Sequence, residues 1–337
     1  MQRDPRHRAD TIASVPSSEL QPEVPALRTL AFATPDAHVL HVEEHGNPRG
    51  AAALVLHGGP GSGCSPLLRR GFDPQRYRVI CVDQRGAGKS RPHGATEHNS
   101  TPHLLADLER LREFLGIERW LVVGGSWGAT LALAYAAARP EAISALLLRS
   151  TFLARRDDID WFFQGAAVLY PAPWRRFAAA APPEQRVALL PWLQQTLAEG
   201  SPAEQAHAAL AWWHWEQTLG GATTVAAPPT GEALTTLVGR YRVQSHYLGH
   251  ECWLNRPPLL QRCAAMPTVP TFLLHANNDQ VCRAAGAQAL HARLPHSRLR
   301  WIEGAGHDAA HPAMLQAMVD ALDCYAQCGH FDGATGP

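Results

Sequence analysis

A serine within a glycine-rich pentapeptide is the residue best placed for nucleophilic chemistry. Ser126 stands in Gly124-Gly125-Ser126-Trp127-Gly128, directly after the apolar run 121–123 and before the helix-like run 129–139. This order predicts a tight strand-to-helix turn that exposes the serine hydroxyl, with small residues on either side so that strand and helix can approach. Ser126 is therefore expected to attack a carbonyl carbon.

A nucleophilic serine needs a general base, and the base needs a carboxylate that orients it. Asp279 follows the apolar run 271–274, and His307 follows the run 299–302 at the end of a Gly-Ala-Gly-His turn. The chain order of serine, acid and histidine is the one that accompanies a strand-turn-helix nucleophile. We expect Ser126, Asp279 and His307 to form a catalytic triad, with Asp308 as the next candidate for the acid.

The tetrahedral intermediate of acyl transfer needs fixed N–H donors for its oxyanion. The segment His57-Gly58-Gly59-Pro60-Gly61 follows the apolar run 53–56, and the backbone of Gly58 or Gly59 would supply one donor. The backbone N–H of Trp127, directly after the nucleophile, would supply the other. A phosphate-binding loop is the alternative for this glycine cluster, but the helix-opening GxGxxG pattern with its acidic ribose ligand is absent.

Two further motifs resemble ligand sites but lack a required member. Gly86-Ala87-Gly88-Lys89-Ser90 ends like a P-loop, yet Asp83 stands where the first glycine of that motif belongs. His307-Asp308-Ala309-Ala310-His311 resembles a zinc-binding HExxH helix, but Asp replaces Glu and Pro312 follows at once. We expect neither nucleotide binding nor a metal ion.

The elements that must position these residues alternate as they do in an α/β protein. Leu104, Leu108, Leu111 and Leu115 recur at helical spacing. Short apolar runs without polar alternation, which are typical of strands covered on both faces, occur at 53–56, 77–82, 120–123, 145–148, 271–274 and 299–302. The pattern predicts a mostly parallel central sheet flanked by helices.

The segment 151–265 has a different composition. Seven of the ten tryptophans fall between Thr151 and Arg262, among helix-forming residues and without a strand series. We expect this segment to be a helical cap inserted into a core formed by residues 27–150 and 266–330. Residues 1–26 are rich in charged residues, proline and serine, which predicts a disordered N-terminal extension.

The bulk composition restricts the class of protein and of partner. Thirty Lys and Arg balance thirty Asp and Glu, so no net charge attracts nucleic acid or an anionic membrane. No apolar run reaches the roughly 18 residues needed to cross a bilayer, and no signal-peptide core is present. The seven cysteines are odd in number and scattered, which predicts reduced thiols. We expect a cytoplasmic enzyme with a small substrate; its oligomeric state stays open.

Several of these motifs together resemble the proline iminopeptidases, which have the α/β-hydrolase fold. The resemblance is carried by HGGPG at 57–61, DQRG at 83–86 and GGSWG at 124–128, and it extends through 149–163, 212–216, 240–247, 279–282 and 304–307. It implies a serine hydrolase that acts as a prolyl aminopeptidase, releasing a free N-terminal proline from peptides through an acyl-enzyme. It also implies that no metal or organic cofactor takes part.

The resemblance further implies how the cap selects the substrate. In relatives an apolar pocket holds the pyrrolidine ring; the matching positions here are Phe152, Val281 and Cys282. Glu216 matches one of two glutamates that bind the substrate ammonium group, whereas Gln244 replaces the second and Leu248 replaces a pocket aromatic. A buried carboxylate paired with the ammonium group rejects a blocked N-terminus, because the charge would then be left unpaired.

Two other functions remain open. Gln244 and Leu248 favour an amidase or esterase that uses the same triad on another small substrate. A non-catalytic binding protein on a hydrolase fold belongs to a different class, but such a protein would usually lack one triad member.

Overall fold

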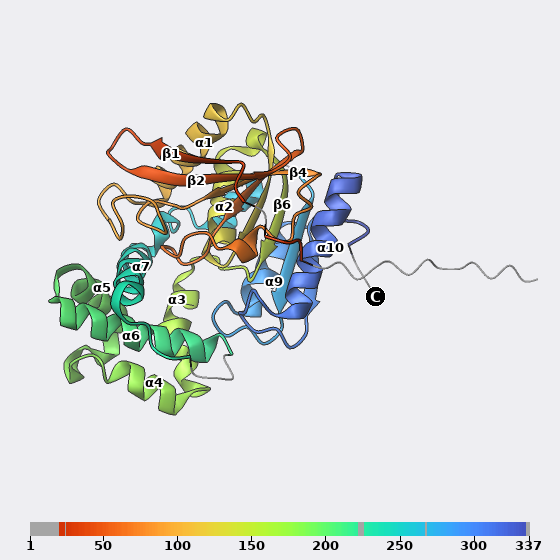
Figure 1. Cartoon of the computed structure of the whole chain (residues 1–337). Coiled ribbons are helices and arrows are strands. Elements are labelled where there is room, and N and C mark those ends of the chain that lie inside the picture. Colours follow the sequence, from red (N-terminus) through yellow and green to blue (C-terminus); the bar gives the residue numbers. More distant parts are fainter. Residues whose placement is uncertain (1–19, 24, 222–225, 267, 335–337) are drawn as a thin grey trace, which may run out of the picture.

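The computed structural model describes residues 20–23, 25–221, 226–266 and 268–334, and these form one twisted sheet with helices on both sides (Figure 1). The described strands form one eight-stranded sheet in the order β1-β2-β4-β3-β5-β6-β7-β8. Their bounds are β1 Arg28–Ala33, β2 Val39–Gly46, β3 Ala51–Leu56, β4 Tyr77–Val82, β5 Trp120–Gly125, β6 Ile143–Arg149, β7 Thr271–Ala276 and β8 Arg298–Ile302.

The six predicted apolar runs are confirmed as β3 to β8, which pair in parallel. Strands β1 and β2 were not predicted; they are antiparallel and extend the sheet beyond β4. In β2 the buried Leu40 and Val42 alternate with His41 and Glu43, because an edge hairpin has one face toward the core and the other partly toward water. The alternation of apolar and polar residues is the sequence signal for β2, but β2 contains no continuous apolar run like those of the predicted strands.

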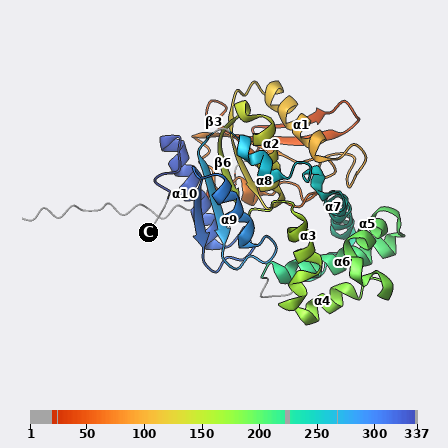
Figure 2. The ribbon, with the colours of Figure 1, turned by 180° about the vertical axis from the view of Figure 1, so that it is seen from behind.

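Helices cover both faces of the sheet. On one face lie α1 (Thr101–Phe114) and α2 (Trp127–Ala138) with α8 (Leu259–Arg262) and α9 (Ala284–Arg293); Figure 2 shows α1, α2 and α8 together in front of the sheet. On the opposite face lies α10 (Pro312–Cys328). Burial on both sides explains the nearly continuous apolar character of the parallel strands.

Helices α3 to α7, which come between β6 and β7 in the chain, form a separate helical layer, which lies to one side of the sheet in Figure 1. Its main helices are α3 Arg156–Phe163, α4 Pro171–Ala178, α5 Leu189–Glu199, α6 Pro202–Leu219 and α7 Gly231–Gly249. Tryptophans form its interior: Trp212 stacks on Tyr241 with ring centroids 4.7 Å apart, and Trp215 stacks on Phe177 at 5.8 Å. We propose that residues 151–265 are a cap over a core of residues 27–150 and 266–330.

Helix α7 packs directly on the glycine-rich loop after β3. A Cβ atom on Gly61, whose φ is +94°, would lie 2.7 Å from the backbone oxygen of Arg240 and 3.2 Å from Cβ of Val243. Any side chain at this position would therefore push α7 away from the loop. The last glycine of HGGPG is needed for the contact between the core and the helical layer.

Most of the predicted N-terminal extension, namely residues 1–19 and 24, lies outside the described residues. The backbone N–H of Gln21 donates to the oxygen of Arg70 (2.8 Å), so residues 20–23 lie against the core. Among the described helices, none combines the length and the apolar character that a membrane span requires.

The turn from β5 into α2 brings three backbone segments into close contact. Ser126 occupies this turn with φ 57° and ψ −122°, a conformation that non-glycine residues rarely adopt. A Cβ atom on Gly124 would lie 2.3 Å from the oxygen of Gly128, and one on Gly128 would lie 2.1 Å from the oxygen of Leu56. The small residues expected on both sides of the serine are thus required by strand β3 as well as by helix α2.

We predict that Gly128→Ala destabilises the protein by about 3 kcal/mol or more, because the added methyl group overlaps backbone that cannot move aside. The control is Gly116→Ala, where φ is positive, unlike at Gly128, but nothing lies within 4 Å of the added Cβ. It should cost only the backbone strain of about 1–2 kcal/mol. Urea unfolding would measure both variants; equal losses would contradict the steric explanation.

Candidate active site

A cavity of about 790 Å³ lies between the core and the helical layer. Of the predicted site residues it is lined by Gly58, Gly59, Ser126, Phe152, Glu216, Gln244, Val281, Cys282 and His307. The two remaining predicted residues, Asp279 and Trp127, are 1% and 0% exposed and lie behind its wall. Residues far apart in the sequence therefore meet around one space, since the carboxyl ends of parallel strands share one sheet edge.

His307 and Asp279 form a hydrogen-bonded pair. The Nδ1 of His307 lies 2.8 Å from Oδ2 of Asp279, and the acceptor-only carboxylate requires that Nδ1 carry the proton. The other carboxylate oxygen accepts the backbone N–H groups of Val281 (2.9 Å) and Cys282 (2.8 Å). The ring is thereby held in the tautomer that leaves Nε2 available as a base.

Electrostatics within the pair favour a charged imidazole. Burial lowers the pKa of His307, but the charge and the hydrogen bond of Asp279 outweigh burial and raise the pKa above its ordinary value of 6.5. Burial raises the pKa of Asp279, but His307 and the loop N–H groups lower it overall, so the carboxylate stays ionised. In its neutral form this imidazole is a stronger base than an ordinary histidine, so it can take a proton from a nearby hydroxyl.

Ser126 lies at the cavity wall beside a buried thiol. Its Oγ is 3.7 Å from Sγ of Cys282. Burial raises the pKa of the Cys282 thiol, which keeps that group neutral and a poor nucleophile. Ser126 therefore remains the candidate nucleophile of the cavity, and Cys282 supplies part of an apolar surface next to it.

Two side chains without a predicted role hold the acid and histidine loops. His275, at the end of β7, accepts the N–H of Thr151 at Nδ1 (3.1 Å) and donates through Nε2 to the oxygen of Cys282 (2.8 Å). Asn278 accepts the N–H of Gly306 (3.0 Å). The position of His275 near the end of a buried strand is a sequence signal for a structural role. Its hydrogen-bond partners could not be predicted, because they lie on other segments of the chain.

Gln84 joins the nucleophile turn to the glycine-rich loop. Its amide donates to the oxygen of His57 (3.1 Å) and accepts from Nε1 of Trp127 (2.8 Å), while its own backbone N–H donates to Nε2 of His57 (3.0 Å). His57 then donates through Nδ1 to the oxygen of Gly58 (2.8 Å). Because a trans peptide places its N–H opposite its carbonyl, the N–H of Gly59 is directed away from His57.

The predicted oxyanion donors have the required backbone character. Trp127 is the first residue of α2, so its N–H has no acceptor within the helix. Gly58 and Gly59 line the cavity beside Ser126. The arrangement could hold an oxyanion between the N–H groups of Gly59 and Trp127, at the positive end of α2.

On the far wall of the cavity Glu216 is already paired. Its Oε2 accepts from Nη2 of Arg240 (2.8 Å) and from the hydroxyl of Tyr241 (2.6 Å). Gln244, one turn further along α7, is buried, and its Oε1 has no hydrogen-bond partner in the described structure. Glu216 and Gln244 were expected from the sequence to face an ammonium group, but Arg240 was not foreseen, because its contact with Glu216 spans two helices.

Apolar side chains fill the space between these polar groups. Besides the predicted Phe152 and Val281, the lining includes Leu248 and two phenylalanines of α3, Phe162 and Phe163, which no sequence motif singled out. A ring or short aliphatic group would be enclosed on several sides here.

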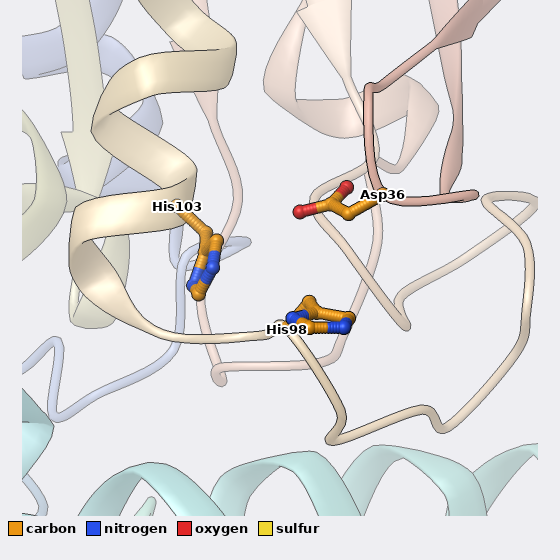
Figure 3. A group of neighbouring side chains, drawn as sticks. All are labelled: Asp36, His98 and His103. Atoms are coloured by element: carbon orange, nitrogen blue, oxygen red, sulfur yellow. The ribbon is translucent and has the colours of Figure 1, made fainter.

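One other cluster among the described residues has side chains suited to a metal ion. Asp36, His98 and His103 each place one ligand atom within 4.8 Å of the others, and Figure 3 shows the three side chains directed toward one another. The Asp36 carboxylate already accepts from Arg85 and Thr34, so it connects the turn after β1 to Arg85 in the segment that follows β4. The zinc-like motif at 307–311 contributes no member to it.

Comparisons with known proteins give a consistent result. A family model described as alpha/beta hydrolase fold matches residues 54–312. The proline iminopeptidase of Xylella fastidiosa (strain Temecula1) is 39% identical over 313 residues, covering 91% of this chain and 99% of the relative. That of Arabidopsis thaliana is 37% identical over 294 residues, covering 85% and 76%.

Solved structures share the fold. The proline iminopeptidase-related protein of Thermus thermophilus is 22% identical with a TM-score of 0.53, covering 90% of this chain and 97% of that one. VinJ is 19% identical with a TM-score of 0.61, covering 90% and 99%. At these identities the likeness concerns the arrangement of the sheet and its helices.

We predict that Asp279→Asn lowers the pKa of His307, because burial then acts without the charge and the hydrogen bond of Asp279. An NMR titration of the imidazole would measure the shift. Asp308→Asn is the matched control, since the Asp308 carboxylate caps the N–H of Ala310 (2.8 Å) and should leave the pKa of His307 unchanged. If Asp308→Asn produced the fall instead, the acid would be Asp308.

Proposed function

The chain belongs to the proline iminopeptidases, a family of α/β hydrolases, and we propose that it is a serine peptidase that releases a free N-terminal proline from small peptides. The observation that carries this proposal is the cavity shared by the Ser126 turn, the His307–Asp279 pair and Glu216. No metal or organic cofactor is needed for the reaction, because nucleophile, base and oxyanion donors all come from the chain.

The chemistry follows from the roles of these groups. His307 takes the proton of Ser126 at Nε2 while Ser126 Oγ attacks the prolyl carbonyl carbon, and the negative oxygen is held by the N–H groups of Gly59 and Trp127. His307 then protonates the leaving amine, which yields the prolyl acyl-enzyme and the shortened peptide. Water, deprotonated by His307, hydrolyses the ester and frees proline. Asp279 stabilises the imidazolium in both halves.

The proposed substrate fits the polar groups of the far wall. A prolyl N-terminus is a secondary ammonium group with two N–H donors. Two acceptors are available for them: Oε1 of Glu216, whose other oxygen is held by Arg240 and Tyr241, and the unpartnered Oε1 of Gln244. The pyrrolidine ring would then lie among Phe152, Val281 and Cys282, where an apolar ring loses little by leaving water.

A second function is favoured by one specific observation. Glu216 already has a cationic partner in Arg240, which reduces its attraction for an ammonium group. An amidase or esterase acting on a neutral small substrate would use the same Ser126 chemistry. Rates with the 2-naphthylamides of proline and alanine, which share one leaving group, report the acyl preference of the pocket. Hydrolysis of a p-nitrophenyl ester without hydrolysis of either naphthylamide would favour the second function.

We predict that Ser126→Ala and His307→Ala each lower kcat by at least about a thousand-fold, because either loss removes attack on the carbonyl. Both variants should keep the circular dichroism spectrum of the wild type, and a serine-directed phosphonate should label the wild type but not Ser126→Ala. A chelator should have no effect. A Ser126→Ala variant that kept more than about one per cent of the wild-type turnover would exclude Ser126 as the nucleophile.

We predict that Gln244→Glu raises kcat/KM for prolyl substrates by about ten-fold, equivalent to about 1.4 kcal/mol, mainly through a lower KM. The added carboxylate would give the ammonium site the negative charge that the Arg240–Glu216 pair lacks. Glu216→Gln should impair the same substrates more severely, and neither change should affect a neutral ester. Lower activity of Gln244→Glu on every amine substrate would instead favour the amidase or esterase.

A further inference from the structure

On the cavity wall that faces Ser126, the negative charge of Glu216 is offset by a neighbouring arginine. Glu216 on α6 and Arg240 on α7 form an ion pair with 2.8 Å between Nη2 and Oε2, and their side chains are 28% (Arg240) and 16% (Glu216) exposed. Both residues line the cavity. A substrate ammonium group that approaches Glu216 therefore meets a carboxylate whose charge is already offset by a guanidinium group.

The ion pair is held in place by its surroundings. Tyr241 donates to the same oxygen of Glu216 and stacks on Trp212 at 4.7 Å, and the guanidinium of Arg240 lies 5.1 Å from the Tyr241 ring. The backbone oxygen of Arg240 faces Gly61 at the joint with the core. Partly buried pairs in fixed geometry are screened by salt and water far less than surface pairs.

The polar atoms of this wall that have no partner within the described part of the chain can form hydrogen bonds with a ligand but offer it little net charge. Oε1 of Gln244 is a buried acceptor without a partner, and Nε of Arg240 is a buried donor without a partner among the described residues. An ammonium group can use the acceptors but is repelled by Arg240. An uncharged acyl group loses little at such a wall, since it leaves no carboxylate without a counter-charge.

We propose that Arg240 is a specificity-determining residue that weakens the preference of this enzyme for a charged acyl group, so that its substrates include anilides and esters of small apolar carboxylic acids without a free amine. The inference rests on the proposed function for the hydrolytic chemistry and for the orientation of the acyl group in the cavity. Arg240 acts through Glu216, and its effect should fall on substrate binding more than on turnover.

The test compares two substrates of nearly equal shape. L-proline 4-nitroanilide has a charged ring nitrogen, whereas cyclopentanecarboxylic acid 4-nitroanilide has a methylene group in its place. The selectivity, defined as kcat/KM for the prolyl substrate divided by kcat/KM for the cyclopentyl substrate, should be no more than about a hundred-fold in the wild type. Arg240→Gln should raise the selectivity by about ten-fold, chiefly through KM for the prolyl substrate, and Arg240→Lys should restore the wild-type selectivity.

The matched control is Arg242→Gln on the same helix. Arg242 bonds to the oxygen of Leu197 and to Gln205, outside the cavity, so its loss should leave the selectivity unchanged. A selectivity that stayed constant or fell in Arg240→Gln would overturn the proposal. The proposal would also be overturned if the wild type hydrolysed the prolyl anilide but not the cyclopentyl anilide. This second outcome is measured on the wild type and does not depend on the folding of any variant.

The same two anilides distinguish an error in the proposed peptidase activity from an error in the role of Arg240. A wild type that hydrolyses the cyclopentyl anilide and not the prolyl anilide would contradict the peptidase activity while supporting specificity for uncharged acyl groups. Wild-type activity on both substrates with unchanged selectivity in Arg240→Gln would leave the peptidase activity standing and overturn the role of Arg240 alone.

Discussion

The close approach of three backbone segments behind Ser126 is the constraint on which the site depends. Strand β5, helix α2 and the end of β3 meet where a methyl group on Gly124 or Gly128 would lie within 2.3 Å of a carbonyl oxygen. This contact holds Ser126 in a backbone conformation with positive φ, directed into the cavity, and it brings the start of α2 next to the loop after β3. The proposed nucleophile and oxyanion donors thus share one rigid junction, which would limit reorganisation during the proposed reaction.

Polar side chains connect this junction to the neighbouring loops. Gln84 bonds to His57 on one side and to Trp127 on the other, and Asn278 and His275 fix the loops that carry Asp279 and His307. His57, Gln84 and His275 are buried in a setting of low dielectric, where an unmet hydrogen bond is costly and a satisfied network gives one well-defined arrangement. Loops at a sheet edge thereby acquire the precision that secondary structure alone would not provide.

The selectivity that we propose arises at the contact between the core and the helical layer. Helix α7 touches Gly61 through the backbone of Arg240, and the side chain of the same residue neutralises Glu216 on α6. One residue of α7 therefore determines both the packing of this helix on Gly61 and the net charge of the cavity wall around Glu216. Under this proposal, changes in this turn of α7 would alter the preferred acyl group without disturbing the His307–Asp279 pair, which belongs to loops of the core.

Local features of the sequence determined the parallel strands, the nucleophile turn and the order of Ser126, Asp279 and His307, because apolar periodicity and the steric need for glycine act over a few neighbouring residues. The hairpin β1–β2 escaped prediction because its alternation is weak and its partner, β4, lies further along the chain. Only the tertiary structure could reveal that Arg240 offsets Glu216, that Gln84 spans two loops and that His275 holds the acid loop. These are contacts between segments far apart in sequence, and their energy depends on distances that residue spacing does not encode.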